Sequence, residues 1–146
     1  MTAKPNPADP AQHREPPPRL VLVDGSNVAH SSEGGQARLA NILAVQAKLR
    51  EEGLDSVIVA DAALRHQIDD AARYERMVDD GVVRQAPAGT DADYFILSFA
   101  DELDASVVSN DRFRDRIGSF PEVRKRLIKY MIVEGEVVFE RRTGRR

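Results

Sequence analysis

Four short apolar runs alternate with segments of helical periodicity, and this alternation limits the folds open to the chain. The runs occupy residues 19–23, 56–60, 82–86 and 106–109. Continuous apolar runs of this length are typical of strands buried on both faces of a parallel sheet. Alternating strands and helices favour right-handed crossovers, which place helices on both faces. We therefore expect an α/β domain with a three-layer, doubly wound parallel sheet.

The other elements follow from apolar spacing and from capping signals. Gly53 and Gly81 stand where helices are expected to end, because glycine readily adopts the left-handed conformation of a C-terminal cap. The helices are expected at residues 36–52, 67–80, 90–103 and 121–126, and two final strands at 127–133 and 136–140.

The two ends of the sequence differ from its middle. Residues 1–18 contain six prolines and almost no large aliphatic side chain, so we expect a disordered leader. Residues 19–141 form the expected domain, and residues 142–146 a basic tail. No stretch approaches the roughly 20 apolar residues of a membrane span. We expect a soluble, cytoplasmic protein without a membrane partner.

Composition restricts the chemistry that the chain can perform. The sequence has no cysteine, which excludes thiol catalysis and cysteine-based zinc sites, and its three histidines are scattered. A bound metal would therefore have mostly oxygen ligands, as Mg²⁺ and Mn²⁺ prefer. The net charge is −3, but residues 112–146 carry 11 Lys and Arg against 5 Asp and Glu. This asymmetry suggests a basic surface on an acidic body.

Acidic residues follow three of the four expected strands. Asp24 ends the first, Asp93 lies in the segment after the third, and Asp111 follows the fourth, with Asp115 four residues later. The carboxyl ends of parallel strands meet at one edge of the sheet. Carboxylates so close repel one another unless a divalent cation neutralises them. We expect these four aspartates to be catalytic metal ligands, Asp115 sharing a face with Asp111 if residues 111–115 form a helical turn.

Polar and basic neighbours of these aspartates are candidate substrate contacts. Ser26 and Asn27 are placed to orient a carboxylate, a water or a substrate phosphate. The basic residues that flank the last acidic site are expected to bind phosphates without reading sequence. They are Arg112, Arg114 and Arg116, with a possible extension along Arg124, Lys125, Arg126, Lys129 and the tail.

Each acidic residue also has an ordinary structural explanation. Asp24 and Gly25 form a common turn signal, and Thr90 with Asp93 matches a capping box. Asp111 can cap a helix, and Asp115 can pair with a nearby arginine. Asp61, which also ends a strand, is expected to be a helix cap or rim residue. The expected convergence on one sheet edge favours the catalytic interpretation for the set.

Three segments together resemble a known family. Residues 23–29 (VDGSNVA), 93–97 (DYFIL) and 107–115 (VVSNDRFRD) resemble, in this order, the NYN branch of PIN-like nucleases, and most of all the Regnase-type endoribonuclease domain. The resemblance spans roughly residues 19–141. It implies a Mg²⁺ or Mn²⁺ site and single-stranded or looped RNA as substrate. It carries the family's functional carboxylates over to Asp24, Asp93, Asp111 and Asp115, and its asparagine to Asn27.

The sequence departs from the Regnase pattern in two places. Where that pattern has adjacent aspartates, this chain has Asp91-Ala92-Asp93, of which Asp93 matches the nearer one and Asp91 is left open. The accompanying cysteine-rich zinc finger is absent from these 146 residues.

The expected function is hydrolysis of RNA phosphodiester bonds by water activated at a carboxylate-held Mg²⁺ or Mn²⁺. The main alternative is a non-catalytic or weakly active domain that binds RNA or a protein partner. A phosphatase of the haloacid-dehalogenase type is disfavoured, because its pattern requires an aspartate at position 26, which is serine here. The sequence leaves a homodimer open.

Overall fold

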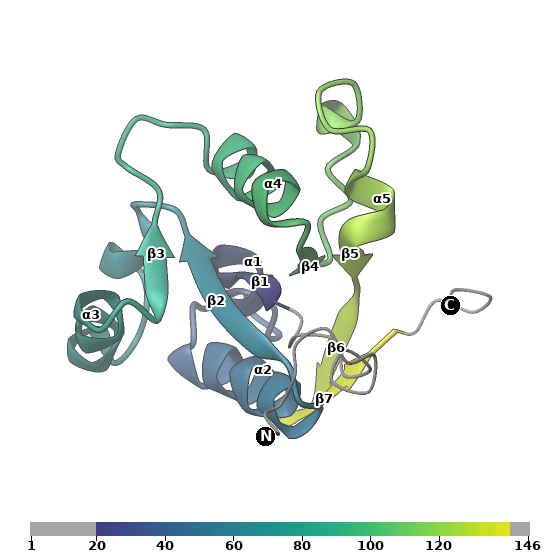
Figure 1. Ribbon diagram of the computed structural model, residues 1–146. Helices are drawn as coiled ribbons and strands as arrows, with labels where there is room; N and C mark the ends of the chain where they lie inside the picture. Colours follow the sequence, from purple (N-terminus) through teal and green to yellow (C-terminus); the bar gives the residue numbers. More distant parts are fainter. Residues whose placement is uncertain (1–19, 141–146) are drawn as a thin grey trace, which may run out of the picture.

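A five-stranded parallel sheet forms the centre of the molecule (Figure 1). The computed structural model describes residues 20–140, so the expected leader and basic tail lie outside the described residues. The sheet has the order β3-β2-β1-β4-β5. Its strands are β1 (Leu20–Asp24), β2 (Asp55–Ala60), β3 (Val83–Gln85), β4 (Ser106–Val108) and β5 (Leu127–Ile128). No helix in the described part of the chain is long and apolar enough to cross a membrane.

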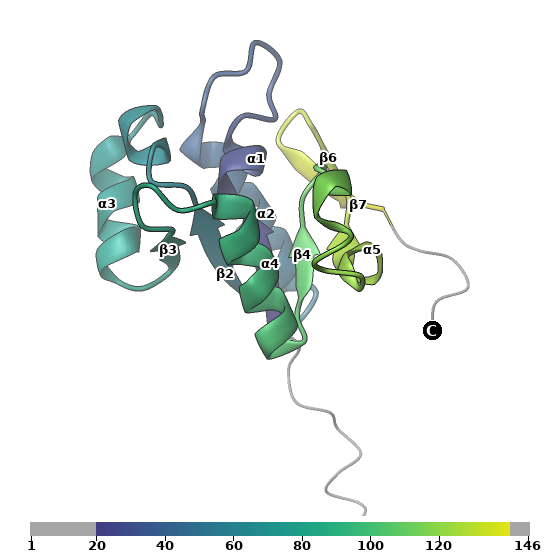
Figure 2. The same cartoon turned by 90° about the horizontal axis from the view of Figure 1, so that it is seen from above.

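Helices cover both faces of the sheet, as expected. Figures 1 and 2 show α2 and α4 on opposite faces, with α3 beside the β3 edge. The helices are α1 (Gly25–Ala29), α2 (Leu39–Glu51), α3 (Ala71–Asp79), α4 (Ala92–Leu103) and α5 (Val123–Arg126), with 3₁₀ turns η2 (Leu64–His66) and η3 (Arg114–Arg116). The three-layer, doubly wound prediction is therefore confirmed.

Strand β1 separates two apolar cores. Val21 and Val23 are buried among side chains of α1 and α2, whereas Leu22 between them packs with α4. Successive side chains of a strand point to opposite faces, so a strand covered on both sides must be apolar at every position. This double burial explains the continuous apolar run.

The strand order reverses between β1 and β4. The chain moves outward from β1 through β2 to β3 and then returns to pair β4 with the other side of β1. Val23 lies opposite Val108 in this parallel pair, so Asp24 and Ser109 are the next residues along. Ligand sites of open α/β sheets lie beyond the carboxyl ends of strands at such a switch point. The topology thus brings two of the expected acidic segments together.

The end of the chain differs from its prediction. The single strand expected over 127–133 is two strands: β5 joins the parallel sheet, and β6 (Tyr130–Val133) pairs antiparallel with β7 (Glu136–Phe139). The hairpin packs Val137 and Phe139 into the core beside α2. The strand is interrupted at Lys129 because β5 pairs within the parallel sheet, whereas β6 pairs with β7. A continuous apolar pattern does not distinguish one strand from two.

Candidate active site

Asp24 begins a helix instead of the expected turn. One carboxylate oxygen, Oδ1, accepts a 3.3 Å hydrogen bond from the Asn27 N–H and so caps the short helix α1. The next residue, Gly25, permits close packing on β2, because a Cβ there would lie 2.8 Å from Cγ2 of Ile58. The turn interpretation of Asp24 and Gly25 is therefore wrong. Position 25 holds glycine because there is no room for a Cβ. Since only Oδ1 of Asp24 caps the helix, Oδ2 remains available for other contacts.

Ser109 connects Asp24 to Asp111. The Ser109 hydroxyl donates a 2.8 Å hydrogen bond to Oδ2 of Asp24 and accepts a 3.0 Å bond from the Asp111 N–H. Ser109 is completely buried. Ser109 was not among the predicted site residues, although it directly precedes Asn110 and Asp111 at the end of a buried apolar run. It holds the first and last acidic segments in a common arrangement.

The expected helical turn over residues 111–115 is wrong. Phe113 has a φ of 52°, in the left-handed region, and Oδ1 of Asp111 accepts a 2.8 Å bond from its N–H. The Phe113 ring is buried in the core beside α4. That burial turns the backbone away from a helical path, and η3 starts only at Arg114. Asp111 and Asp115 therefore do not share the face of one helical turn, as was expected.

At the start of α4, Asp91 caps the helix. Its Oδ1 accepts hydrogen bonds from the N–H groups of Asp93 (3.1 Å) and Tyr94 (3.2 Å). The capping box from Thr90 is wrong, since the Thr90 hydroxyl donates to the Pro87 carbonyl instead. Asp91 thus orients the first turn of α4, which carries Asp93.

Arg116 lies against these two carboxylates. Its Nη2 is 2.6 Å from Oδ2 of Asp91, and its Nε is 4.0 Å from Oδ2 of Asp93. Arg116 was expected to contact substrate phosphate. In the structure its guanidinium instead neutralises part of the acidic cluster. An aspartate pair that binds an arginine is a feature that spacing in the sequence does not reveal.

Two adjoining hollows present the acidic side chains. Asp24 and Asp93 line a small cavity of about 50 Å³, together with Ser26 and Asp61. A larger recess of about 530 Å³, the acidic recess, is lined by Asp93 and by the segment from Asn110 to Arg116, which includes Asp111 and Asp115. Asp93 belongs to both. The structure therefore places all four expected aspartates around two hollows that share Asp93 near the switch point.

Ser26 and Asp61 form the rim of the small cavity. The Asp61 N–H donates to the Ser26 hydroxyl at 3.2 Å, and Oδ1 of Asp61 accepts from the Leu64 N–H at 2.9 Å. Asp61 was expected to be a helix cap or a rim residue, and it lies on the rim of this cavity, whereas the N-cap of η2 is Ala63. Ser26 holds the end of β2 against α1, so its oxygen already has a partner.

The acidic side chains influence one another electrostatically. The pKa of Asp24 is raised from 3.8 to about 6, mainly by burial and also by the negative charges of Asp93 and Asp111, while hydrogen bonds from Ser109 and Asn27 oppose the increase. Burial also raises the pKa of Asp93, with a further increase from Asp111 and an opposing effect of Arg116. The repulsion between these carboxylates would be relieved by a nearby cation.

The donor set fits a hard divalent cation. Within residues 20–140, no group of three or more acidic or histidine side chains is already arranged around one point. Asp24 and Asp93 nevertheless share a cavity, and Mg²⁺ is commonly held by one or two carboxylates while waters fill its other positions. The residues present therefore suit such an ion with two direct carboxylates.

Asn27 connects three segments of the chain. Its Oδ1 accepts hydrogen bonds from the Tyr130 hydroxyl (2.7 Å) and from the Asn110 N–H (3.1 Å). The Asn110 side chain in turn pairs with the backbone of Tyr130 through two bonds of 3.0 and 3.1 Å. Asn27 was expected to orient a carboxylate, a water or a substrate phosphate, and in the structure its side-chain oxygen positions α1 against the β4 loop and the hairpin. Sequence reasoning missed Tyr130, because nothing near it marks a polar role.

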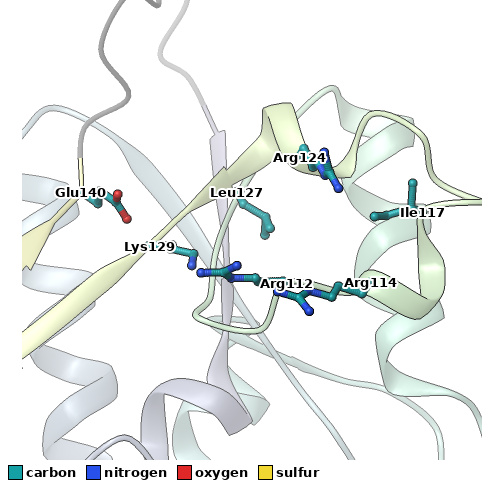
Figure 3. Close-up of a pocket in the computed structure, with 7 residues that line it drawn as sticks. All are labelled: Arg112, Arg114, Ile117, Arg124, Leu127, Lys129 and Glu140. Atoms are coloured by element: carbon teal, nitrogen blue, oxygen red, sulfur yellow. The ribbon is translucent and has the colours of Figure 1, made fainter.

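The expected basic track is only partly formed. Arg112 and Arg114 line a recess of about 500 Å³, the basic recess, with Arg124 and Lys129 (Figure 3). Arg126 does not take part, since it pairs with Asp101 and Asp104 at 3.1 and 3.0 Å. Lys125 pairs with Glu122 at 2.8 Å. The tail arginines lie outside the described residues.

A doubly wound parallel sheet with aspartates around its switch point is the arrangement expected of a PIN-like nuclease domain. The particular family follows from the sequence as a whole. The chain belongs to the Zc3h12a-like ribonuclease NYN domain family, whose model matches residues 17–146. The resemblance drawn from the three motifs is thereby confirmed. No curated protein matches the sequence.

Solved structures of one plant enzyme share the fold. The crystal structure of Arabidopsis thaliana nuclear proteinaceous RNase P 2 (PRORP2) has a TM-score of 0.69 at 23% identity and covers 83% of this chain but 29% of its own. A second PRORP2 structure, named nuclear protein-only RNase P 2, has a TM-score of 0.68 at 23% identity, with 89% and 30% covered. The chain thus spans less than a third of PRORP2, and the likeness shows the fold alone.

Proposed function

We propose that this domain is a metal-dependent endoribonuclease that hydrolyses phosphodiester bonds of single-stranded or looped RNA. The observation that carries the proposal is the convergence of Asp24, Asp93 and Asp111. They come from three segments and line two hollows that share Asp93, and the negative charge of Asp111 helps to raise the pKa of Asp24 and of Asp93. Membership of a ribonuclease family supports RNA as the substrate.

Mg²⁺ or Mn²⁺ is the cofactor that this donor set suits. Asp24 and Asp93 would hold the ion from their shared cavity, and Asp111 and Asp115 would act from the adjoining recess. Such a cation supplies polarisation of a phosphoryl oxygen and a lower pKa of water. It also removes the repulsion that an acidic cleft otherwise exerts on a phosphodiester.

The chain's own residues position the reactants. Ser109 fixes the Asp24 carboxylate through Oδ2, and the Asn27 N–H fixes it through Oδ1. Oδ1 of Asp111 is occupied by the Phe113 N–H, which leaves Oδ2 to accept a proton from an attacking water. Arg114 lines the same recess and offsets the charge of the scissile phosphate. General-base assistance of this kind typically contributes a factor of about 10²–10⁴.

The test compares Asp24→Asn and Asp111→Asn with the wild type on a mixed-sequence RNA in Mn²⁺. We expect both variants to lose nearly all cleavage while circular dichroism shows an unchanged fold. Asp79→Asn, at an exposed position of α3, is the control and should cleave normally. A circular single-stranded RNA tests the mode of attack, because only an endonuclease opens it. Full activity of both site variants would reject the proposal.

One observation favours a second candidate, an RNA-binding domain without turnover. Arg116 already neutralises Asp91 and approaches Asp93, and the described residues contain no preassembled ion site. Such a domain would bind RNA in EDTA and would not cleave it in the presence of any metal. Titration of Mg²⁺ and Mn²⁺ into a cleavage assay separates the two candidates directly.

A further inference from the structure

The basic recess has features that the acidic site does not explain. It has a volume of about 500 Å³ and is lined by Arg112, Arg114, Ile117, Arg124, Leu127, Lys129 and Glu140. Figure 3 shows these side chains coming from the β4 loop, from the segment around α5 and from both ends of the hairpin. Arg112 and Arg114 also line the acidic recess. The two recesses therefore share a wall.

Three positive side chains of the basic recess form no side-chain bond within the described part of the chain. Within residues 20–140, Arg112, Arg114 and Lys129 form no side-chain hydrogen bond or ion pair, whereas Arg65, Arg116 and Arg126 are all paired. Like charges that line one hollow repel, which is unfavourable unless an anion enters. Arginine binds phosphate through a planar fork, and lysine through a compact charge. This arrangement suits a phosphate group.

The recess also has an apolar part. Ile117 and Leu127 are half-buried and pack against the core beside α4. The volume lies within the roughly 300–1,000 Å³ typical of small-molecule sites. Unpaired RNA bases stack on arginine guanidinium planes, and a base that enters a pocket can also pack between aromatic or apolar side chains. A phosphate alone would leave this part of the recess empty, whereas a nucleotide would fill it.

We propose that the basic recess holds one unpaired nucleotide of the RNA strand, next to the phosphodiester in the acidic recess. Its phosphate contacts Arg112 and Lys129, and its base packs against Ile117 and Leu127. Glu140, the one carboxylate among the described lining residues, disfavours a second phosphate at the β7 end and can accept a hydrogen bond from a sugar hydroxyl. The inference rests on the proposed function and extends it. A base inside a duplex is stacked and paired, so it cannot enter, and unpaired RNA is selected.

Binding measured in EDTA tests the phosphate contacts without turnover. Fluorescence anisotropy of a short single-stranded RNA is recorded at several salt concentrations for the wild type and for Arg112→Gln/Lys129→Gln, the recess variant. We expect at least a tenfold loss of affinity, and a shallower dependence of log K on log salt, by about 0.7 for each lost phosphate contact. The matched control is Lys48→Gln/Arg76→Gln, which removes the same charge from α2 and α3. Equal salt slopes for the recess variant and the wild type would overturn the proposal.

Two altered RNAs test the base pocket. An abasic residue moved along the strand should weaken wild-type binding several-fold at one position, and this loss should shrink in the recess variant. A fully paired hairpin stem should bind the wild type at least tenfold more weakly than the single strand does. If the abasic residue has the same effect at every position, or if the stem binds as tightly as the single strand, the recess binds phosphates without a base.

Cleavage data separate this inference from the proposed function. If the wild type cleaves RNA in Mn²⁺, Asp24→Asn does not, and the recess variant binds and cleaves normally, the basic recess is rejected and the nuclease remains. If no protein cleaves but the recess variant alone loses binding of single strands, the nuclease proposal is rejected and the nucleotide site remains.

Discussion

The hydroxyl of Ser109 donates a 2.8 Å hydrogen bond to Oδ2 of Asp24, joining residues 85 positions apart in the sequence. The bond crosses the switch point between β4 and β1. This hydrogen bond lowers the pKa of Asp24, whereas burial raises that pKa, and the net value is about 6. A single buried hydroxyl thus helps to decide how much of Asp24 is ionised near neutral pH.

Ser109→Ala should move the activity profile to higher pH. Loss of the donor raises the pKa of Asp24, so the acid limb of kcat/KM against pH shifts upward. Stability should fall by about 1 kcal/mol, as is typical of one lost hydrogen bond. Ser106→Ala, on the same strand, is the control, since Ser106 forms no side-chain hydrogen bond with residues 20–140. An unshifted acid limb would contradict this role of Ser109.

Asp24→Asn should change how stability depends on pH in EDTA. The pKa of Asp24 is raised from 3.8 to about 6, so the folded state binds this proton more tightly than the unfolded state. The resulting stabilisation is complete below about pH 3.8 and is lost as the pH rises through about 6. The loss is at most about 3 kcal/mol for two pKa units, and less where water reaches the carboxylate.

Urea unfolding at pH 4 and pH 7 measures the effect. Between these values, the free energy of unfolding of the wild type should fall relative to that of Asp24→Asn. Other titrating groups are common to both proteins and cancel in the comparison. Parallel curves for the two proteins would show that Asp24 has an ordinary pKa in the fold.

Divalent cations should stabilise the protein through the acidic cavity. A cation at 100 times its dissociation constant stabilises by about 2.7 kcal/mol, because it binds only the folded state. We expect Mn²⁺ to raise the Tm of the wild type, and to raise that of Asp24→Asn and Asp93→Asn much less. Asp79→Asn should respond like the wild type. If all four proteins respond equally, the ion binds elsewhere.

Substitutions of Asp91 and Asp93 should have very different effects on cleavage, although the two residues are only two positions apart. Asp91 caps α4 and binds Arg116, whereas Asp93 lines both hollows. Asparagine is as good an N-cap as aspartate, so Asp91→Asn should retain stability within about 1 kcal/mol and retain cleavage. Asp93→Asn should lose cleavage. Loss of activity in Asp91→Asn with an intact fold would place Asp91 in the site.

Tyr130→Phe should impair cleavage, and Tyr74→Phe should not. Each hydroxyl donates one hydrogen bond from a buried ring, Tyr130 to Asn27 at 2.7 Å and Tyr74 to Gln85 at 3.0 Å. Each variant should therefore lose about 0.5–1.5 kcal/mol of stability in urea unfolding. Only Tyr130 positions α1 and the hairpin beside the site. Equal activities of the two variants would limit Asn27 and Tyr130 to a structural role.

Much of the site was predictable because it lies at strand ends. Apolar runs located β1 and β4, and the parallel arrangement placed Asp24 and Asp111 at one edge. The errors came where one local pattern fits two conformations. The Asp24-Gly25 pair matched a turn but begins α1, and the residues after Asp111 matched a helical turn until the buried Phe113 excluded it.

The sequence by itself determined which segments are buried on both faces, and hence a parallel sheet with its acidic residues at one edge. Only the tertiary structure decided that Ser109 binds Asp24, that Tyr130 binds Asn27 and that Arg116 neutralises Asp91. Periodicity and capping reflect interactions over a few residues. Contacts between distant residues depend on strand order and on how the hairpin packs, and these are set by the burial of the whole core.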